Sequence, residues 1–225
     1  MTKTVRPTFD LENSCQEQLI AGIDEAGCGP LAGSVVAGAL IFLTQDIPDD
    51  LKAIVNDSKK LTEKKRLKAY DLIQNLKGTI LDFGVGIATV GEIDSLNIGR
   101  ATRLAMERAI ADLSTKPDFA LIDGIRKPNL PCPSMTVIKG DATSTSIAAA
   151  SIVAKVTRDK IMQELDLSYP AYGWAKNAGY GTASHIEAIH QHGITPHHRK
   201  SFEPIKSLLG APIQLNLFDA YTQST

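Results

Sequence analysis

The sequence is poor in cysteine and lacks a long apolar run, and both absences limit what the protein can be. Its three cysteines, Cys15, Cys28 and Cys132, are an odd number without C-x-x-C spacing. This argues against a disulfide framework or a structural zinc site and fits a reducing cytoplasm. The longest apolar run, residues 31–43, is interrupted by glycine and serine and falls short of the roughly 20 residues that a membrane helix needs. Residues 1–18 do not resemble a signal peptide, so we expect a cytoplasmic protein without membrane association.

An excess of charge of either sign is also missing. The 225 residues include 24 basic and 25 acidic side chains, with a net charge of −1 at pH 7. No global basic field therefore indicates a nucleic-acid partner, and any such affinity must come from a local patch. The hydrophobic content of 43% can supply the core of one domain, and we expect a monomer.

Apolar runs and helical periodicity predict an α/β domain. We expect short strands at residues 18–24, 34–42, 78–88, 119–123 and 135–139. Helices are expected at residues 62–76, 91–113, 143–167, 183–191 and 203–210, and the stretch 51–61 is loop-like. The first three strands can pair as an antiparallel meander, whereas the later ones need crossover connections and parallel pairing. The result is a mixed sheet of about five strands flanked by helices. We divide the chain into a polar arm (1–18), a domain (19–210) with a C-terminal helical part from about 168, and a tail (211–225).

Acidic residues stand where predicted strands end. Asp24 and Glu25 follow the first strand, Asp123 follows the fourth, and Asp141 follows the fifth. Singly, each has an ordinary interpretation: strand end, Asp-Gly turn or helix N-cap. Their co-occurrence at successive strand ends instead favours a carboxylate site for hard divalent cations. Asp159, inside a predicted helix, is expected to pair with Lys155 on the surface.

Several other residues are candidates for binding a phosphate backbone. The glycines in GCG (Gly27, Cys28, Gly29) allow close backbone approach and expose N–H groups that can hold phosphate. Lys59, His198 and Arg199 are candidate phosphate contacts, although a charge run is more often a solvated face. Tyr180, between two glycines, can stack on a sugar or base or anchor its loop. Tyr172 and Trp174 are expected to be buried, and the small residues of 143–156 should pack closely. We reject zinc at the histidines, because no H-E-x-x-H motif or nearby cysteine accompanies them.

Seven motifs together resemble bacterial ribonuclease HII. They are GIDEAGCGPLAG, NDSKKL, ALIDG, VIKGDA, SIAAASIVAKVTRD, YGW-x-x-x-x-GYGT and TPHHRKSF, in the family's order from about residue 20 to 209. The resemblance implies a ribonuclease H-like fold with a five-stranded mixed sheet and a C-terminal helical part. It also implies an endoribonuclease that cuts RNA–DNA hybrids and single ribonucleotides embedded in duplex DNA, leaving 5′-phosphate and 3′-hydroxyl ends.

The resemblance assigns roles by position. Asp24, Glu25, Asp123 and Asp141 would be the active-site acids and would hold two Mg²⁺ or Mn²⁺ ions, one activating water and the other stabilising the leaving oxygen. Asp159 also matches a family aspartate and is the weakest ligand candidate. The segment 27–29 would recognise the ribonucleotide 2′-OH largely through backbone. Tyr180 would stack on the following deoxyribose, so that the pair senses an RNA–DNA junction.

The chain departs from the family at two places. Cys28 replaces the usual arginine, and Ala178 replaces the usual lysine, so two cations are missing near the junction-reading segment. Loss of a phosphate contact at position 28 would cost about 1.5–3 kcal/mol. We therefore expect weaker but still active cleavage, and Cys28 as a reactive thiol is an alternative without support in the sequence.

The tail carries a second resemblance. Gln214, Leu215, Leu217 and Phe218 match the Gln-Leu-x-Leu-Phe peptide by which bacterial replication and repair proteins bind the sliding clamp. Such peptides anchor apolar side chains in a preformed groove. An amphipathic tail folded back on the domain is the alternative.

Two other functions compete with the ribonuclease. A DNA junction resolvase of the same fold would not need a segment that reads a 2′-OH. A non-catalytic hybrid-binding protein or clamp adaptor would not need four clustered acids, whose mutual repulsion is unfavourable unless metal neutralises it. Both features favour the enzyme, with a role in ribonucleotide removal, DNA replication and repair.

Overall fold

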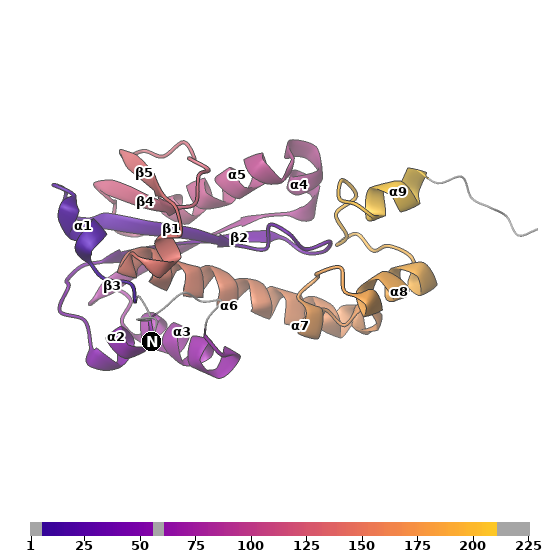
Figure 1. The fold of residues 1–225 in the computed structure, drawn as a ribbon, viewed down its shortest axis with the longest axis horizontal. Coiled ribbons are helices and arrows are strands. Elements are labelled where there is room, and N and C mark those ends of the chain that lie inside the picture. Colours follow the sequence, from indigo (N-terminus) through magenta and orange to yellow (C-terminus); the bar gives the residue numbers. More distant parts are fainter. Residues whose placement is uncertain (1–5, 56–60, 211–225) are drawn as a thin grey trace, which may run out of the picture.

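A five-stranded mixed sheet forms the centre of the protein (Figure 1). The computed structural model describes residues 6–55 and 61–210. The sheet order is β3-β2-β1-β4-β5, with antiparallel pairing among the first three strands and parallel pairing of β1 with β4 and β4 with β5. The strands are β1 (Ile20–Ala26), β2 (Val35–Phe42), β3 (Leu81–Ala88), β4 (Phe119–Asp123) and β5 (Ser134–Val137). The predicted fold class, including the meander, is confirmed.

Helices cover the sheet on both faces. The long helix α6 (Thr145–Ser168) lies on one face with α3 (Glu63–Asn75), while α4 (Val90–Leu96) and α5 (Ile98–Ala111) lie on the other (Figure 1). Successive strand residues point to opposite faces, so Ala21 and Ile23 of β1 join the core on the α5 side. The intervening residues of β1 point toward α6.

Small residues bring α6 very close to the sheet. A Cβ atom added to Gly22 in β1 would lie 2.2 Å from the backbone nitrogen of Ile147, and one added to Gly38 in β2 would lie 2.5 Å from the Ala150 carbonyl oxygen. Only glycine permits this distance. The expected close packing of the first half of this helix is therefore confirmed.

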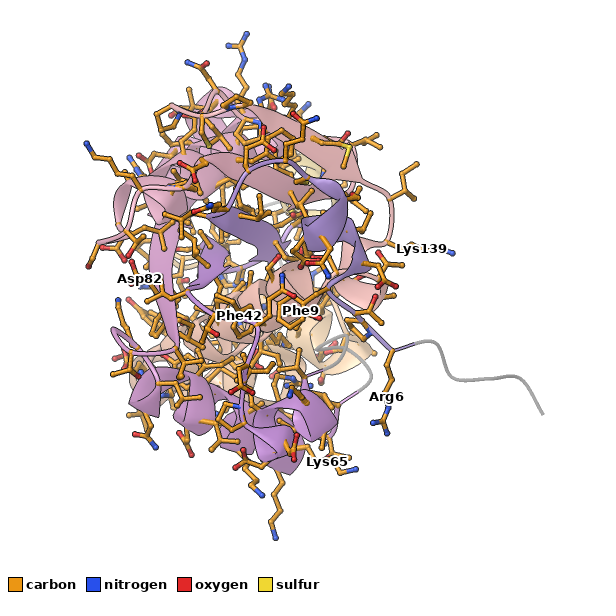
Figure 2. The ribbon with its side chains drawn as sticks, turned by 90° about the vertical axis from the view of Figure 1, so that its left-hand side faces the viewer. Arg6, Phe9, Phe42, Lys65, Asp82 and Lys139 are labelled. Carbon is orange, nitrogen blue, oxygen red and sulfur yellow. The ribbon has the colours of Figure 1, made fainter. Side chains whose placement is uncertain are left out.

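The N-terminal segment differs from the polar arm that the sequence predicts. Residues 10–14 form a short helix, α1 (Asp10–Ser14). The Phe9 ring meets the Phe42 ring edge-on at 5.2 Å between centroids (Figure 2). The Glu12 carboxylate is buried and accepts hydrogen bonds from Ser144 Oγ at 2.7 Å and from Ser146 N at 2.9 Å. A carboxylate at the N-terminus of α6 complements the helix dipole, so these residues belong to the folded domain.

Two predicted boundaries are wrong. The stretch expected to be loop-like begins inside a helix, α2 (Asp49–Ile54), whose buried Leu51 packs in the core. The single helix expected at residues 91–113 is two helices that meet at Asn97. This residue has φ 69°, and its side chain caps α5 by accepting from Arg100 N. Asparagine tolerates positive φ and is a favoured N-cap, so it ends one helix and starts the next.

The C-terminal helical part lies beyond the end of the sheet, beside the last turns of α6 (Figure 1). It contains a 3₁₀ turn η2 (Pro170–Tyr172), α7 (Trp174–Asn177), α8 (Ala183–His192) and α9 (Ile205–Gly210). Its own core includes the stacked rings of Tyr172 and Trp174, both buried as expected. No helix among the described residues is long and apolar enough to cross a membrane.

Candidate active site

Three of the four predicted acids meet in space. Asp24, Asp123 and Asp141 each offer a carboxylate oxygen, and these oxygens all lie within 4.8 Å of one another. Asp24 and Asp141 are buried, whereas Asp123 is partly exposed. We call these three residues the acid cluster. Carboxylate oxygens are the donors that hard cations such as Mg²⁺ and Mn²⁺ prefer, so the donor set fits a divalent ion.

Strand pairing explains this convergence. The neighbouring residue Ile23 of β1 pairs with Ile122 of the parallel strand β4, so Asp24 and Asp123 end up at the same edge of the sheet. The Asp123 Oδ1 atom accepts a hydrogen bond from Gly140 N at 2.7 Å. That bond ties the end of β4 to the 3₁₀ turn η1 (Gly140–Ala142), which carries Asp141.

Glu25 lies beside the acid cluster and is not a member of it. As the next residue on β1 it points to the opposite face from Asp24. Its Oε1 atom is 3.7 Å from Arg126 Nη1 and accepts from the Cys28 thiol at 3.4 Å. We expected four acids in one cluster, and three of them form it. Glu25 is separate because side chains alternate between the two faces of a strand. Arg126, three residues after Asp123, is a contact that we did not predict.

Asp159 is placed as its ordinary interpretation predicts. Its carboxylate binds Lys155 Nζ at 2.6 Å, one helical turn away, and lies 3.4 Å from Arg66 Nη1. It does not belong to the acid cluster. Lys155 and Arg66 hold the Asp159 carboxylate on the side of α6 that faces α3. This position, outside the acid cluster, agrees with its being the weakest ligand candidate.

The segment of residues 27–29, which we call the junction loop, directly follows β1 and contacts Tyr180. A Cβ atom added to Gly29 would lie 3.5 Å from Cε1 of the Tyr180 ring. The Tyr180 side chain is 50% exposed. Gly27 has φ +96°, and a Cβ atom there would lie 2.0 Å from Nε of Arg158, so no other residue fits. The structure therefore brings together the two elements to which the family resemblance gives a role in junction recognition.

Cys28 turns its side chain inward rather than toward solvent. Its Sγ atom lies 3.4 Å from Glu25 Oε1 and 3.3 Å from Thr102 Oγ1 of α5. Burial, followed by the Glu25 charge, raises the pKa of this thiol to about 11. The thiol is therefore protonated at neutral pH, which argues against the alternative of a reactive cysteine. Thr102 gave no sequence signal, because only tertiary packing brings α5 to the loop.

The prediction that His198 and Arg199 contact phosphate is wrong in this structure. Both side chains are fully buried. His198 is hydrogen-bonded to Thr195 and His185, and burial, with the neighbouring His185 and His197 next, lowers its pKa to about 4. Arg199 donates to backbone carbonyls. The charge run at residues 197–200 suggests a solvated surface from the sequence, but His198 and Arg199 are part of the core.

Other predicted positions are exposed or outside the described residues. Lys139, which directly precedes the turn η1 that carries Asp141, has φ 57° and extends into solvent (Figure 2). Lys59 lies outside the described residues, as do all four candidate clamp-binding residues, Gln214, Leu215, Leu217 and Phe218.

Comparisons with known proteins agree with this geometry. The sequence model of the family described as ribonuclease HII matches residues 21–205. This chain belongs to the ribonuclease HII family. The ribonuclease HII of Gluconobacter oxydans (strain 621H) is 48% identical over 205 residues, covering 91% of this chain and 97% of that protein. The ribonuclease HII of Vibrio campbellii (strain ATCC BAA-1116) is 52% identical over 193 residues, covering 86% and 88%.

Solved structures of ribonucleases H share the fold. Ribonuclease H2 from Pyrococcus horikoshii OT3 superposes with a TM-score of 0.70 at 27% identity, covering 84% of this chain and 96% of that one. The structure of the PCNA:RNase HII complex from Archaeoglobus fulgidus gives 0.66 at 24% identity, covering 89% and 99%. Bst-RNase HIII in complex with Mn²⁺ gives 0.67 at 17% identity, covering 91% and 73%.

Membership of the ribonuclease HII family settles the broad activity. The chain is a ribonuclease H hydrolase, and the family acts on RNA–DNA hybrids with divalent metal ions. A non-catalytic adaptor and a DNA junction resolvase are thereby excluded as the main function. The departure at Ala178 also has a structural context, since this residue has φ 49° and its carbonyl accepts from Arg158 Nη1 at 3.0 Å.

Proposed function

We propose that the enzyme incises duplex DNA 5′ to embedded ribonucleotides, in addition to cutting the RNA strand of hybrids, and leaves 5′-phosphate and 3′-hydroxyl ends. The observation that carries the proposal is the continuity of two parts. The acid cluster begins at Asp24, and the junction loop with Tyr180 beside it begins three residues later. The residues that we propose for cutting and for reading the 2′-OH are thus close together in β1 and the loop that follows it.

The acid cluster supplies the ligands for divalent ions. Asp24, Asp123 and Asp141 would hold one ion, and Glu25, the next residue after Asp24 on β1, would contribute to a second. When bound, the two ions supply an activated water and stabilise the leaving 3′ oxygen. Without a cation, three carboxylates this close repel one another, which supports metal binding. The Mn²⁺ of the Bst-RNase HIII complex belongs to a protein of the same fold, and either Mg²⁺ or Mn²⁺ suits oxygen ligands.

The junction loop and Tyr180 supply the selectivity. Backbone N–H groups of the loop can bond a 2′-OH, the group that distinguishes RNA from DNA. The half-exposed Tyr180 ring offers a flat face for the next sugar, where an additional 2′-OH would obstruct the stack. Together they favour a ribonucleotide followed by a deoxyribonucleotide. The substrates we propose are therefore RNA–DNA hybrids and duplexes with embedded ribonucleotides, in the cytoplasm, during replication and repair.

The test uses a duplex that contains one ribonucleotide, incubated with Mg²⁺, with Mn²⁺ and with a chelator. We expect a single incision 5′ to the ribonucleotide that requires a divalent ion. The near-isosteric change Asp24→Asn removes a ligand charge and should lower kcat by at least about a hundredfold, as loss of several kcal/mol of charge stabilisation implies. Cutting in chelator, or full activity of the variant, would refute the proposal.

We also propose that the tail binds the bacterial sliding clamp through Gln214, Leu215, Leu217 and Phe218. The motif supports this, and the archaeal RNase HII structure, which is a complex with PCNA, offers a distant parallel. Removing residues 212–225 should abolish clamp binding and leave incision of short duplexes unchanged. Surface plasmon resonance on immobilised clamp measures the first effect, and equal clamp affinity of both forms would end the idea.

A further inference from the structure

The buried guanidinium of Arg199 binds the backbone of the junction loop. Arg199 donates to the carbonyl oxygens of two junction-loop residues, Gly27 at 2.6 Å and Cys28 at 3.1 Å, and to that of the nearby Gly33 at 2.7 and 2.9 Å. These contacts join residues that are 166–172 positions apart in the sequence. A second buried arginine, Arg158, binds other carbonyls nearby and none of the junction loop.

The trans geometry of the peptide bond makes these contacts directional. In each peptide unit the C=O and the N–H point in opposite directions. Because the Gly27 and Cys28 carbonyls point at Arg199, the N–H groups of Cys28 and Gly29 point away from it. Within the described part of the chain, neither N–H donates to a protein acceptor, and Gly29 is exposed. Two donors therefore point away from Arg199, in a loop whose Gly29 is exposed and lies beside the Tyr180 ring.

Arg199 also places a positive charge under the loop. Burial, followed by the charge of Arg158, lowers its pKa to about 10, so the side chain remains protonated at neutral pH. Among the described residues no carboxylate lies within ion-pair distance of it. The charge is thus available to attract a phosphate near the loop, where Cys28 supplies none. Backbone carbonyl oxygens accept its N–H groups, which keeps those carbonyls oriented, and the Phe202 ring centroid lies 5.0 Å from its Cζ atom.

We propose that Arg199 is a positioning residue for ribonucleotide recognition: it fixes the junction loop so that the Cys28 and Gly29 N–H groups read the 2′-OH. This inference rests on the proposed function, since it concerns how that function selects its substrate. Arg199 itself does not touch the nucleic acid. A side chain near the C-terminus thus preorganises a loop near the other end of the chain.

The decisive measurement is discrimination rather than activity. Binding is measured by fluorescence anisotropy in an Asp123→Asn background, which prevents cutting, with two duplexes that differ by a single 2′-OH. Arg199→Lys keeps the charge but cannot bond three carbonyls from one planar group. The ratio of the two dissociation constants should fall at least about tenfold, as expected for lost hydrogen bonds to a 2′-OH. Affinity for the all-DNA duplex should change little in Arg199→Lys and weaken in Arg199→Gln, which removes the charge.

A matched control separates positioning from stability. Ile73→Ala truncates a fully buried side chain of α3 in the core on the α6 side of the sheet. It should lower the melting temperature, as Arg199→Lys does, without changing the discrimination ratio. If Arg199→Lys discriminates as well as the parent, Arg199 has only a structural role and the inference is wrong. If the parent itself does not discriminate and the unmodified enzyme does not incise, the proposed function fails instead.

A second measurement needs no change at Arg199 and covers the case in which the variants do not fold. Amide proton exchange of Cys28 and Gly29 is followed by NMR in the Asp123→Asn protein. Both amides should exchange more slowly on binding the ribonucleotide-containing duplex than on binding the all-DNA duplex. Equal exchange in the two complexes would overturn the proposal.

Discussion

The buried side chain of His198 should make the protein less stable in acid than at neutral pH. The Thr195 N–H donates to His198 Nδ1 at 2.9 Å, so that nitrogen carries no proton. The proton is on Nε2 and is donated to His185 Nε2 at 3.1 Å, which also accepts from Trp174 Nε1 at 3.0 Å. His185 Nδ1 then donates to the Tyr180 carbonyl at 2.8 Å. Every polar atom of this network is satisfied with both rings neutral.

Protonation of His198 would place a new proton against the Thr195 N–H and a charge inside the core. Burial, followed by the neighbouring His185 and His197, therefore lowers its pKa from 6.5 to about 4. A histidine whose pKa is lowered by folding binds more protons when unfolded. Its contribution is fully present above pH 6.5 and is lost as the pH falls toward 4. Over that window it amounts to about 3 kcal/mol, at 1.36 kcal/mol per pKa unit. His185 and His197, whose pKa values are also lowered by burial, act in the same direction.

The assay is urea unfolding between pH 7 and 4, followed by the fluorescence of Trp174, the only tryptophan in the sequence. His198→Gln should be less stable than the wild type at pH 7. The gap between the two free energies of unfolding should shrink by about 3 kcal/mol by pH 4. His190→Gln changes an exposed histidine of the adjacent helix α8 and serves as the control. A gap for His198→Gln that stays constant across this range would show that His198 titrates normally, and the buried-network interpretation would be wrong.

The remaining predictions concern the junction loop and Tyr180. Cys28→Arg should lower KM for the embedded-ribonucleotide duplex with kcat unchanged, because the guanidinium side chain is too large for the space that the thiol fills between Glu25 and Thr102 and would extend toward phosphate. Steady-state kinetics measure it, and unchanged KM and rate would show that the missing arginine does not weaken binding. Tyr180→Ala should lower kcat/KM on the same duplex by about 10- to 100-fold, as expected for a stacking loss of roughly 1–3 kcal/mol. Its melting temperature should stay close to that of the wild type, since the ring is half exposed; unchanged kcat/KM would refute the stacking role.

The strands and the acids of the active site could be predicted from local sequence. The run FALID predicts β4 with both ends correct, because a short apolar stretch before Asp-Gly has few alternatives. The helix predicted at residues 62–76 is confirmed as α3, and Thr62 is its N-cap. The single helix predicted at residues 91–113 is wrong, because helical periodicity continues through Asn97, where α4 ends and α5 begins.

The sequence alone therefore determined the fold class, the order of motifs and the edge of the sheet at which Asp24, Asp123 and Asp141 meet. Only the tertiary structure decided that Glu25 faces away from them, that Cys28 turns inward, and that His198 and Arg199 are buried. The physical reason is the range of the interactions involved. Strand alternation and apolar runs act over a few residues, whereas the burial of Arg199 depends on carbonyl groups of residues 27, 28 and 33, which approach it only when the whole chain has folded.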